Sequence, residues 1–194
     1  MSKSKQMYIG GQWVDAEGGA TFDVMNPSTG ETCHAVADAS RADTARALEV
    51  AAEAQKQWAE TPHGQRARIV HKIGDILEAR AQEFHDALID EGGSWIGKAM
   101  YETGYSSGVY RAAAAAAYQA NGEILPSDYN KLSLVVREPL GVVSVIAPWN
   151  FPLILGSRGF ATALAVGNAI ILKPSEETPV AGGVLVASIL EEAG

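Results

Sequence analysis

Two short, mostly apolar runs that contain several β-branched residues lie in the last third of the chain, over 142–147 and 168–172. Continuous apolar runs of this length are typical of strands that a parallel sheet buries on both faces. Apolar positions at helical spacing occupy 153–166 and 179–193, and prolines or glycines punctuate the segments. This order predicts a right-handed β-α-β-α unit and hence a Rossmann-like parallel sheet.

Polar residues follow both predicted strands. Pro148, Trp149 and Asn150 come after the first strand, and the sequence Lys-Pro-Ser-Glu at 173–176 comes after the second. In a parallel sheet the carboxyl ends of neighbouring strands meet at one edge, where ligands bind. We therefore expect the two tips to face the same crevice.

The first two thirds of the chain predict small antiparallel pieces followed by helices. Residues 7–14 favour a hairpin with a two-glycine turn, where positive φ costs nothing. Ser40 and Asp43 mark a helix start, since a hydroxyl acceptor is followed three residues later by a carboxylate. Helical spacing over 65–90 predicts two helices with a bend near 79–83.

Small residues dominate the next helical segment, 94–119. Its Gly97, Gly104 and Gly108 each cost up to about 1 kcal/mol relative to alanine, so we expect a smooth helix face that packs closely against another element. Residues 132–137 then predict a strand. This strand lies too far from a turn to form a hairpin, so we expect its partner outside this chain.

Composition excludes several classes of protein. Fifteen Lys and Arg stand against 23 Asp and Glu, a net charge of −8, which disfavours nucleic acid as a partner. No apolar run reaches the roughly 18 to 20 residues that a membrane span requires. The polar start of the chain lacks a secretory signal core, so we expect a cytoplasmic protein.

The single cysteine, Cys33, excludes an internal disulfide framework and a cysteine-based zinc site. Its sequence neighbour His34 would point to the opposite face of a strand, so we do not expect Cys33 and His34 to form a catalytic pair. The sequence has no glycine-rich phosphate loop and no H-E-x-x-H motif. We expect no metal site.

Both strand tips allow a structural and a chemical interpretation. Asn150 either caps the following helix or offers its amide to a developing oxyanion. Lys173 and Glu176 are either solvated charges before a helix capped by Thr178, or a clamp on the two hydroxyls of an adenosine ribose. A carboxylate in such a clamp repels a 2′-phosphate, which favours NAD over NADP.

Residues 142–152, VVSVIAPWNFP, and 167–176, GNAIILKPSE, closely resemble the aldehyde dehydrogenase superfamily. Residues 8–14 and 26–31 are similar to the opening of that family, so the resemblance extends from Tyr8 to the last residue. The resemblance implies NAD-dependent oxidation of an aldehyde to a carboxylic acid, through a thiohemiacetal and a thioester on a cysteine.

The resemblance also implies roles for individual residues. Asn150 would stabilise the thiohemiacetal oxyanion, and Lys173 and Glu176 would hold the adenine ribose. The implied cofactor-binding residues are Ile146, Ala147, Pro148, Trp149, Asn150, Lys173, Ser175 and Glu176. Segments 94–99 and 156–160 look more like the branch that oxidises benzaldehyde or vanillin than the betaine-aldehyde branch.

Three parts follow from the same resemblance. Residues 1–125 hold the hairpins and helices, 126–141 begin a β arm through which subunits form homo-oligomers, and 142–194 are the first units of the NAD-binding fold. No residue matches the family's nucleophilic cysteine or glutamate base. We therefore expect an incomplete α/β fold, the N-terminal portion of a longer enzyme, that is inactive alone. The alternative is a non-catalytic nucleotide-binding or assembly module.

Overall fold

The computed structural model describes residues 6–119 and 122–194, so most of the polar start of the chain lies outside the described residues. The elements, in chain order, are β1 (Met7–Ile9), β2 (Gln12–Val14), a 3₁₀ turn (Glu17–Gly19), β3 (Thr21–Met25), β4 (Thr32–Ala37), α1 (Arg41–Glu60), α2 (His63–Ala79), α3 (Ala81–Asp90), α4 (Ile96–Ala116), β5 (Gly122–Leu125), β6 (Ser133–Val136), β7 (Val142–Ile146), α5 (Pro152–Ala165), β8 (Ala169–Lys173), a π-helical turn (Val180–Val184) and α6 (Leu185–Ala193).

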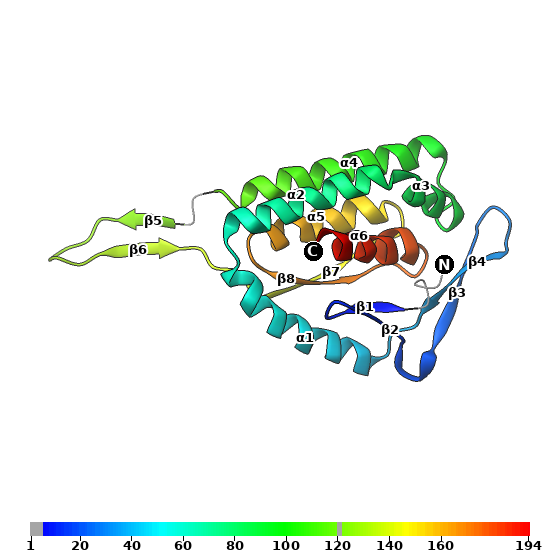
Figure 1. The fold of residues 1–194 in the computed structure, drawn as a ribbon, viewed down its shortest axis with the longest axis horizontal. Coiled ribbons are helices and arrows are strands. Elements are labelled where there is room, and N and C mark those ends of the chain that lie inside the picture. Colours follow the sequence, from blue (N-terminus) through cyan, green and yellow to red (C-terminus); the bar gives the residue numbers. More distant parts are fainter. Residues whose placement is uncertain (1–5, 120–121) are drawn as a thin grey trace.

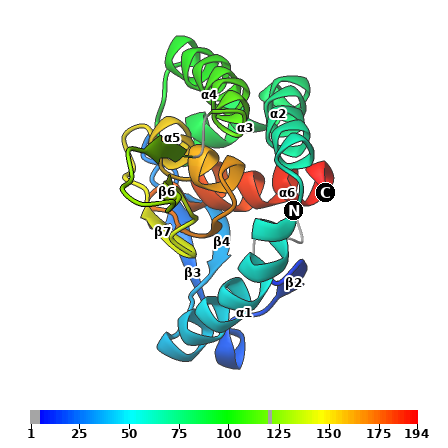
Figure 2. The ribbon, with the colours of Figure 1, turned by 90° about the vertical axis from the view of Figure 1, so that its left-hand side faces the viewer.

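β7 and β8 form a parallel pair connected by α5, with Ile146 opposite Lys173 at the carboxyl ends. Figures 1 and 2 show α1 against one face of this pair and α5 against the other. The predicted β-α-β-α order is confirmed. The predicted burial is wrong, because Val145 is the only buried residue of the two strands. Each strand has one described neighbour, so its outer edge is open.

The predicted local signals of the first part are also confirmed. Ser40 Oγ accepts the Asp43 N–H at 3.1 Å, and Asp43 Oδ2 accepts the Ser40 N–H at 3.0 Å, which starts α1 with a capping box. α2 and α3 meet at Arg80, whose φ of −103° and ψ of 18° interrupt the helical path. Gly10 and Gly11, at φ 62° and 77°, form the turn of the β1–β2 hairpin.

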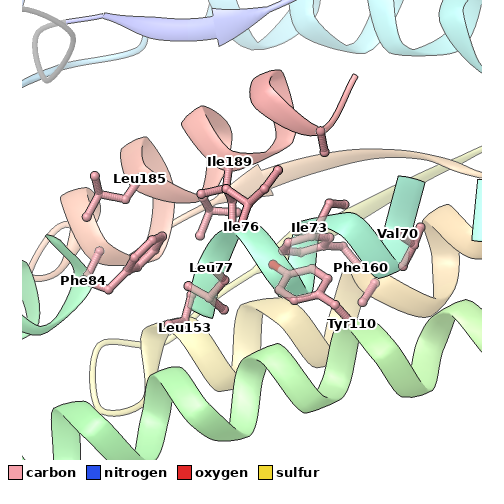
Figure 3. Close-up of a cluster of buried hydrophobic side chains, with 14 of the residues drawn as sticks. Val70, Ile73, Ile76, Leu77, Phe84, Tyr110, Leu153, Phe160, Leu185 and Ile189 are labelled. Atoms are coloured by element: carbon pink, nitrogen blue, oxygen red, sulfur yellow. The ribbon is translucent and has the colours of Figure 1, made fainter. Parts of the chain in front are cut away.

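The hydrophobic core lies where α2, α4, α5 and α6 meet, as Figure 3 shows. Fully buried side chains of this cluster are Val70, Ile73, Leu77, Phe84, Leu88, Tyr110, Leu153, Phe160 and Ile189. Burying one such side chain stabilises the fold by about 1.5 to 3 kcal/mol. Residues before and after the projecting hairpin build this core together, so the helical part and the β-α-β-α part share one interior.

Close packing between α2 and α4 depends on a glycine of α2. A methyl group on Gly74 would lie 2.8 Å from the carbonyl oxygen of Ser107, which is shorter than a normal contact. The expectation that the glycines of α4 pack closely is wrong for Gly104 and Gly108, where an added methyl would meet no described atom within 4 Å. These two glycines lie on the exposed side of α4.

A hairpin of β5 and β6 projects from the body of the molecule (Figure 1). The expectation that the strand near 132–137 has no partner within this chain is wrong, because residues 122–125 pair with it in antiparallel register. Tyr129 and Asn130, both at positive φ, lie in the connecting loop. The exposed apolar side chains of the hairpin are Ile124, Leu125, Tyr129, Leu132, Leu134, Val135 and Val136.

Substitution by alanine should have opposite effects on stability at the closely packed Gly74 and at the exposed Gly104. We expect Gly74→Ala to lower the free energy of unfolding by about 1 to 3 kcal/mol, because the methyl group overpacks the α2–α4 contact. The control, Gly104→Ala, has open space and is expected to raise it by about 0.5 to 1 kcal/mol. Urea unfolding of both variants measures the difference, and a stabilising Gly74→Ala would contradict the proposed contact.

Candidate functional site

The two predicted tips lie next to each other at the carboxyl edge of the β7–β8 pair. The Ala147 N–H donates to the Lys173 carbonyl at 3.0 Å, so pairing continues to the last residues before both turns. Ala147 is buried, whereas Ile146 and Trp149 expose 76% and 61% of their surface. The structure thus brings the predicted residues to one edge and leaves large side chains open there.

Asn150 does not cap α5. Its Oδ1 accepts only the adjacent Phe151 N–H, at 3.1 Å, and α5 has no side-chain cap from its own N-terminal residue. The Leu153 and Ile154 N–H groups instead donate to Glu102 Oε1, at 2.8 and 3.4 Å. The helix-cap interpretation of Asn150 is therefore wrong. Within the described part of the chain, the exposed Asn150 side chain accepts this one hydrogen bond, and its NH₂ group donates none.

Lys173 and Glu176 form an ion pair across the second turn, with Nζ and Oε2 3.1 Å apart. Their side chains are 59% and 70% exposed, so the pair contributes little to stability. The Glu176 backbone N–H and the Lys173 ammonium lower the pKa of the Glu176 carboxyl below its usual value. The Glu176 carboxyl is therefore ionised at neutral pH, and both side chains face solvent.

Ser175 and Thr178 are buried in the same turn. Ser175 Oγ accepts the Glu177 N–H at 3.3 Å. The expectation that Thr178 caps the next helix is wrong, because its hydroxyl has no hydrogen-bond partner among the described residues. The Val180 and Ala181 N–H groups donate to the Glu91 carboxylate instead.

Glu91 accepts these two backbone N–H groups at 2.8 and 2.6 Å and is 3% exposed. Burial raises the pKa of its carboxyl to about 8, although the hydrogen bonds from Val180 and Ala181 oppose this shift, and the nearby Asp90 charge adds to it. A buried carboxyl from the end of α3 thus holds the beginning of the π-helical turn.

Glycines allow this turn to pack directly on Pro152, the first residue of α5, and on Pro174 of the second tip. A methyl group on Gly182 would lie 2.9 Å from Pro152 Cβ, and one on Gly183 would lie 2.7 Å from Pro174 Cγ. Contacts this short are essentially never tolerated without movement of a neighbour. The turn before α6 therefore fixes the backbone beside both tips.

A cavity of about 1050 Å³ opens along the outer edge of β8. It is lined by the β1–β2 hairpin, α1, β8, the turn after β8, and α6. Lys173, Ser175 and Glu176 stand on its wall, but residues 146–150 do not. Of the two tips, this cavity therefore contains only the second, and the expected crevice shared by both tips stays a prediction.

Cys33 lies on β4 and donates from Sγ to the Val24 carbonyl at 3.3 Å. Burial, with the Glu91 charge as a second cause, raises the pKa of its thiol, which disfavours the reactive thiolate. No group of three or more metal-ligating side chains occurs in residues 6–119 and 122–194. No helix in these ranges is long and apolar enough to cross a membrane.

Comparison with known proteins assigns the chain to a family. Residues 13–194 match the sequence description of the aldehyde dehydrogenase family. The chain belongs to the aldehyde dehydrogenase family. This finding confirms the resemblance that the two strand-tip motifs carry.

Several aldehyde dehydrogenases are similar to it. Vanillin dehydrogenase of Amycolatopsis sp. is 45% identical over 184 residues, which cover 95% of this chain and 38% of that protein. Benzaldehyde dehydrogenase (NAD⁺) of Pseudomonas putida is 43% identical over 94% of this chain and 37% of its own length. The chain thus spans about two fifths of these curated relatives.

A solved structure supports the same assignment. The NAD-dependent benzaldehyde dehydrogenase from Corynebacterium glutamicum matches with a TM-score of 0.94 and 40% identity, over 98% of this chain and 42% of that chain. The predicted α/β fold, that of the N-terminal part of aldehyde dehydrogenases, is therefore confirmed.

Sequence reasoning missed Glu91 and Glu102. A signal for Glu102 exists, since it lies on the same helical side as Ala99, Ser106 and Tyr110, all of which are buried. A lone acid within such a stripe points to a buried partner. Glu91 stands beyond the end of α3, where no periodic pattern marks it.

Glu91 should give the stability a characteristic pH dependence. Its pKa of about 8 in the folded state exceeds the ordinary 4.5, so the folded state keeps a proton that the unfolded state loses between these values. Its contribution is fully present below the lower value and is lost as pH rises through the upper one, at roughly 1.4 kcal/mol per pH unit or less.

Urea unfolding between about pH 5 and pH 9 measures this effect. The free energy of unfolding should fall more steeply with pH in the wild type than in Glu91→Gln, which cannot titrate. Parallel curves for the two proteins would show that Glu91 does not carry the shifted pKa.

Proposed function

We propose that this chain is part of an NAD-dependent aldehyde dehydrogenase that oxidises an aldehyde to a carboxylic acid. The observation that carries the proposal is the exposed Asn150 side chain at a strand tip, whose NH₂ group donates to no described residue, in a chain that belongs to the aldehyde dehydrogenase family. Vanillin and benzaldehyde dehydrogenases are among the similar proteins, which favours an aromatic aldehyde as substrate.

In this proposal Asn150 donates its side-chain N–H to the oxyanion that forms when a thiolate adds to the aldehyde carbon. A preorganised donor of this kind stabilises charge that develops only in the transition state. Cys33 does not provide the thiolate, because its pKa is raised and its sulfur is engaged with the Val24 carbonyl. The nucleophile and the general base are supplied from outside these 194 residues.

Lys173 and Glu176 suit the adenosine ribose of NAD, with Ser175 and residues 146–149 beside it. An ammonium and a carboxylate 3.1 Å apart, both exposed, can exchange their mutual hydrogen bond for bonds to two neighbouring hydroxyls. NAD, when bound, accepts the hydride from the substrate carbon. The negative charge of Glu176 disfavours the 2′-phosphate of NADP.

We also propose that the β5–β6 hairpin joins copies of the protein into a homo-oligomer. The support is its projection from the body and its run of exposed apolar side chains, since large exposed apolar patches mark interaction sites. Residues 122–136 would then form the arm, slightly earlier in the chain than the predicted 126–141.

Asn150→Ala tests the central role. In the full-length enzyme we expect kcat to fall by about 10² to 10³, as for removal of one oxyanion donor in other enzymes, while the Kd for NAD changes little. Steady-state kinetics with benzaldehyde or vanillin and fluorescence titration with NAD measure the two quantities. Turnover within a few-fold of wild type would refute the assignment.

Glu176→Gln tests the cofactor preference. The change removes the charge that repels a 2′-phosphate, so the preference in kcat/KM for NAD over NADP should narrow, by a factor that solvent screening of this exposed side chain limits. Glu177→Gln is the matched control, because Glu177 is also exposed but has no ion pair with Lys173. Equal effects of the two variants would argue against a specific role of Glu176.

A further inference from the structure

A glutamate of α4 controls the first turn of α5, the helix that follows Asn150. Glu102 is completely buried, and its Oε1 accepts both the Leu153 and the Ile154 N–H. These are among the N–H groups that a helix cannot satisfy internally. The carboxylate thus does for α5 what a side chain at its own N-cap normally does, from 51 residues earlier in the chain.

The second oxygen of Glu102 reaches a lysine that contacts the same turn. Lys98 Nζ lies 3.0 Å from Glu102 Oε2 and 2.9 Å from Ser94 Oγ. The same ammonium stands over the Phe151 ring, 4.8 Å from its centroid. One turn of α4 therefore holds the segment that follows Asn150 at two points. The Lys98 ammonium contacts Phe151, and the Glu102 carboxylate accepts the backbone N–H groups of the first turn of α5.

Asn150 has little else to orient it. Its side chain is exposed, and its one hydrogen bond within the described residues goes to the adjacent Phe151 N–H. The direction of its amide therefore follows from the backbone at 150–151. Oxyanion donors must be placed to within a fraction of an ångström, so that backbone has to be held by groups outside the turn.

Stability alone does not account for the pair. Burying a carboxylate and most of an ammonium carries a large desolvation cost, and apolar replacements of buried ion pairs are often no less stable. A fixed anion and cation do, however, define one position for the groups that they contact. We propose that Glu102 and Lys98 are positioning residues for catalysis, which hold Asn150 through Phe151 and the first turn of α5; this inference rests on the proposed aldehyde oxidation.

Lys98→Met provides the kinetic test. Methionine keeps an unbranched side chain of similar length but removes the ammonium, while Glu102 keeps the hydrogen bonds from the Leu153 and Ile154 N–H groups. In the full-length enzyme we expect kcat to fall about 10- to 100-fold, while KM for NAD stays within about threefold. In an Asn150→Ala background the same change should have almost no further effect on kcat.

This double-mutant cycle separates positioning from general destabilisation. A loss of kcat that persists undiminished in the Asn150→Ala background would overturn the proposal, and so would unchanged kcat in Lys98→Met. Absence of aldehyde oxidation by the wild type would instead refute the proposed function itself, before any variant is considered.

Amide hydrogen exchange tests whether Glu102 holds the first turn of α5, and it requires no activity measurement. Glu102→Ala should accelerate exchange at Leu153 and Ile154, whereas the matched control, Glu91→Ala, should accelerate it at Val180 and Ala181. Both variants lose a buried carboxylate at a helix start. Overall destabilisation would therefore accelerate exchange at all four amides in both variants, and not at one pair of amides in each. Equal acceleration at Leu153 and Ile154 in both variants would contradict the proposed hold of Glu102.

Discussion

The arrangement of this chain depends on satisfying the backbone ends of one buried helix, α5. Leu153 and Ile154 at its start and Ala165 at its end are buried, and unpaired buried polar groups are costly. Glu102 accepts the N–H groups at the start. At the other end Trp58 Nε1 donates to the Leu164 carbonyl at 2.9 Å, and Arg66 Nε donates to the Ala165 carbonyl at 3.1 Å.

These partners come from three different helices of the first part of the chain. Trp58 lies on α1, Arg66 on α2 and Glu102 on α4, so the polar ends of α5 define how those helices surround it. Asn168 completes the arrangement, because its amide donates to the Ala163 carbonyl and accepts the Gly141 N–H at the start of β7. The long N-terminal stretch is thus a support for the strand–helix–strand unit.

The sequence predicted what is encoded locally. Periodicity gave the β-α-β-α order, and Ser40 with Asp43 gave the start of α1, because each signal lies within a few residues. The strand-tip residues were also recognisable from their order. Contacts that join distant segments were not predictable in this way: the Glu102 carboxylate meets α5 only after α4 has packed beside it.

The errors have the same origin. Asn150 and Thr178 stand where a capping residue is common, and propensity favoured that interpretation for both. Tertiary carboxylates, from Glu102 and Glu91, took the N–H groups that those side chains would have accepted. The β5–β6 pairing was missed because residues 122–125 include few β-branched residues, so their strand character depends on the partner.

The glycine pair before α6 has a consequence for how this site can evolve. Gly182 and Gly183 let the chain lie directly against Pro152 and Pro174, so the backbone at the start of α5 and at the second tip is held by contacts that leave no room for an added carbon. Glu176 by contrast projects into solvent. Single substitutions at Glu176 can therefore change the charge beside a bound nucleotide during natural or laboratory selection. Substitutions of Gly182 or Gly183, by contrast, require neighbouring residues to move at the same time.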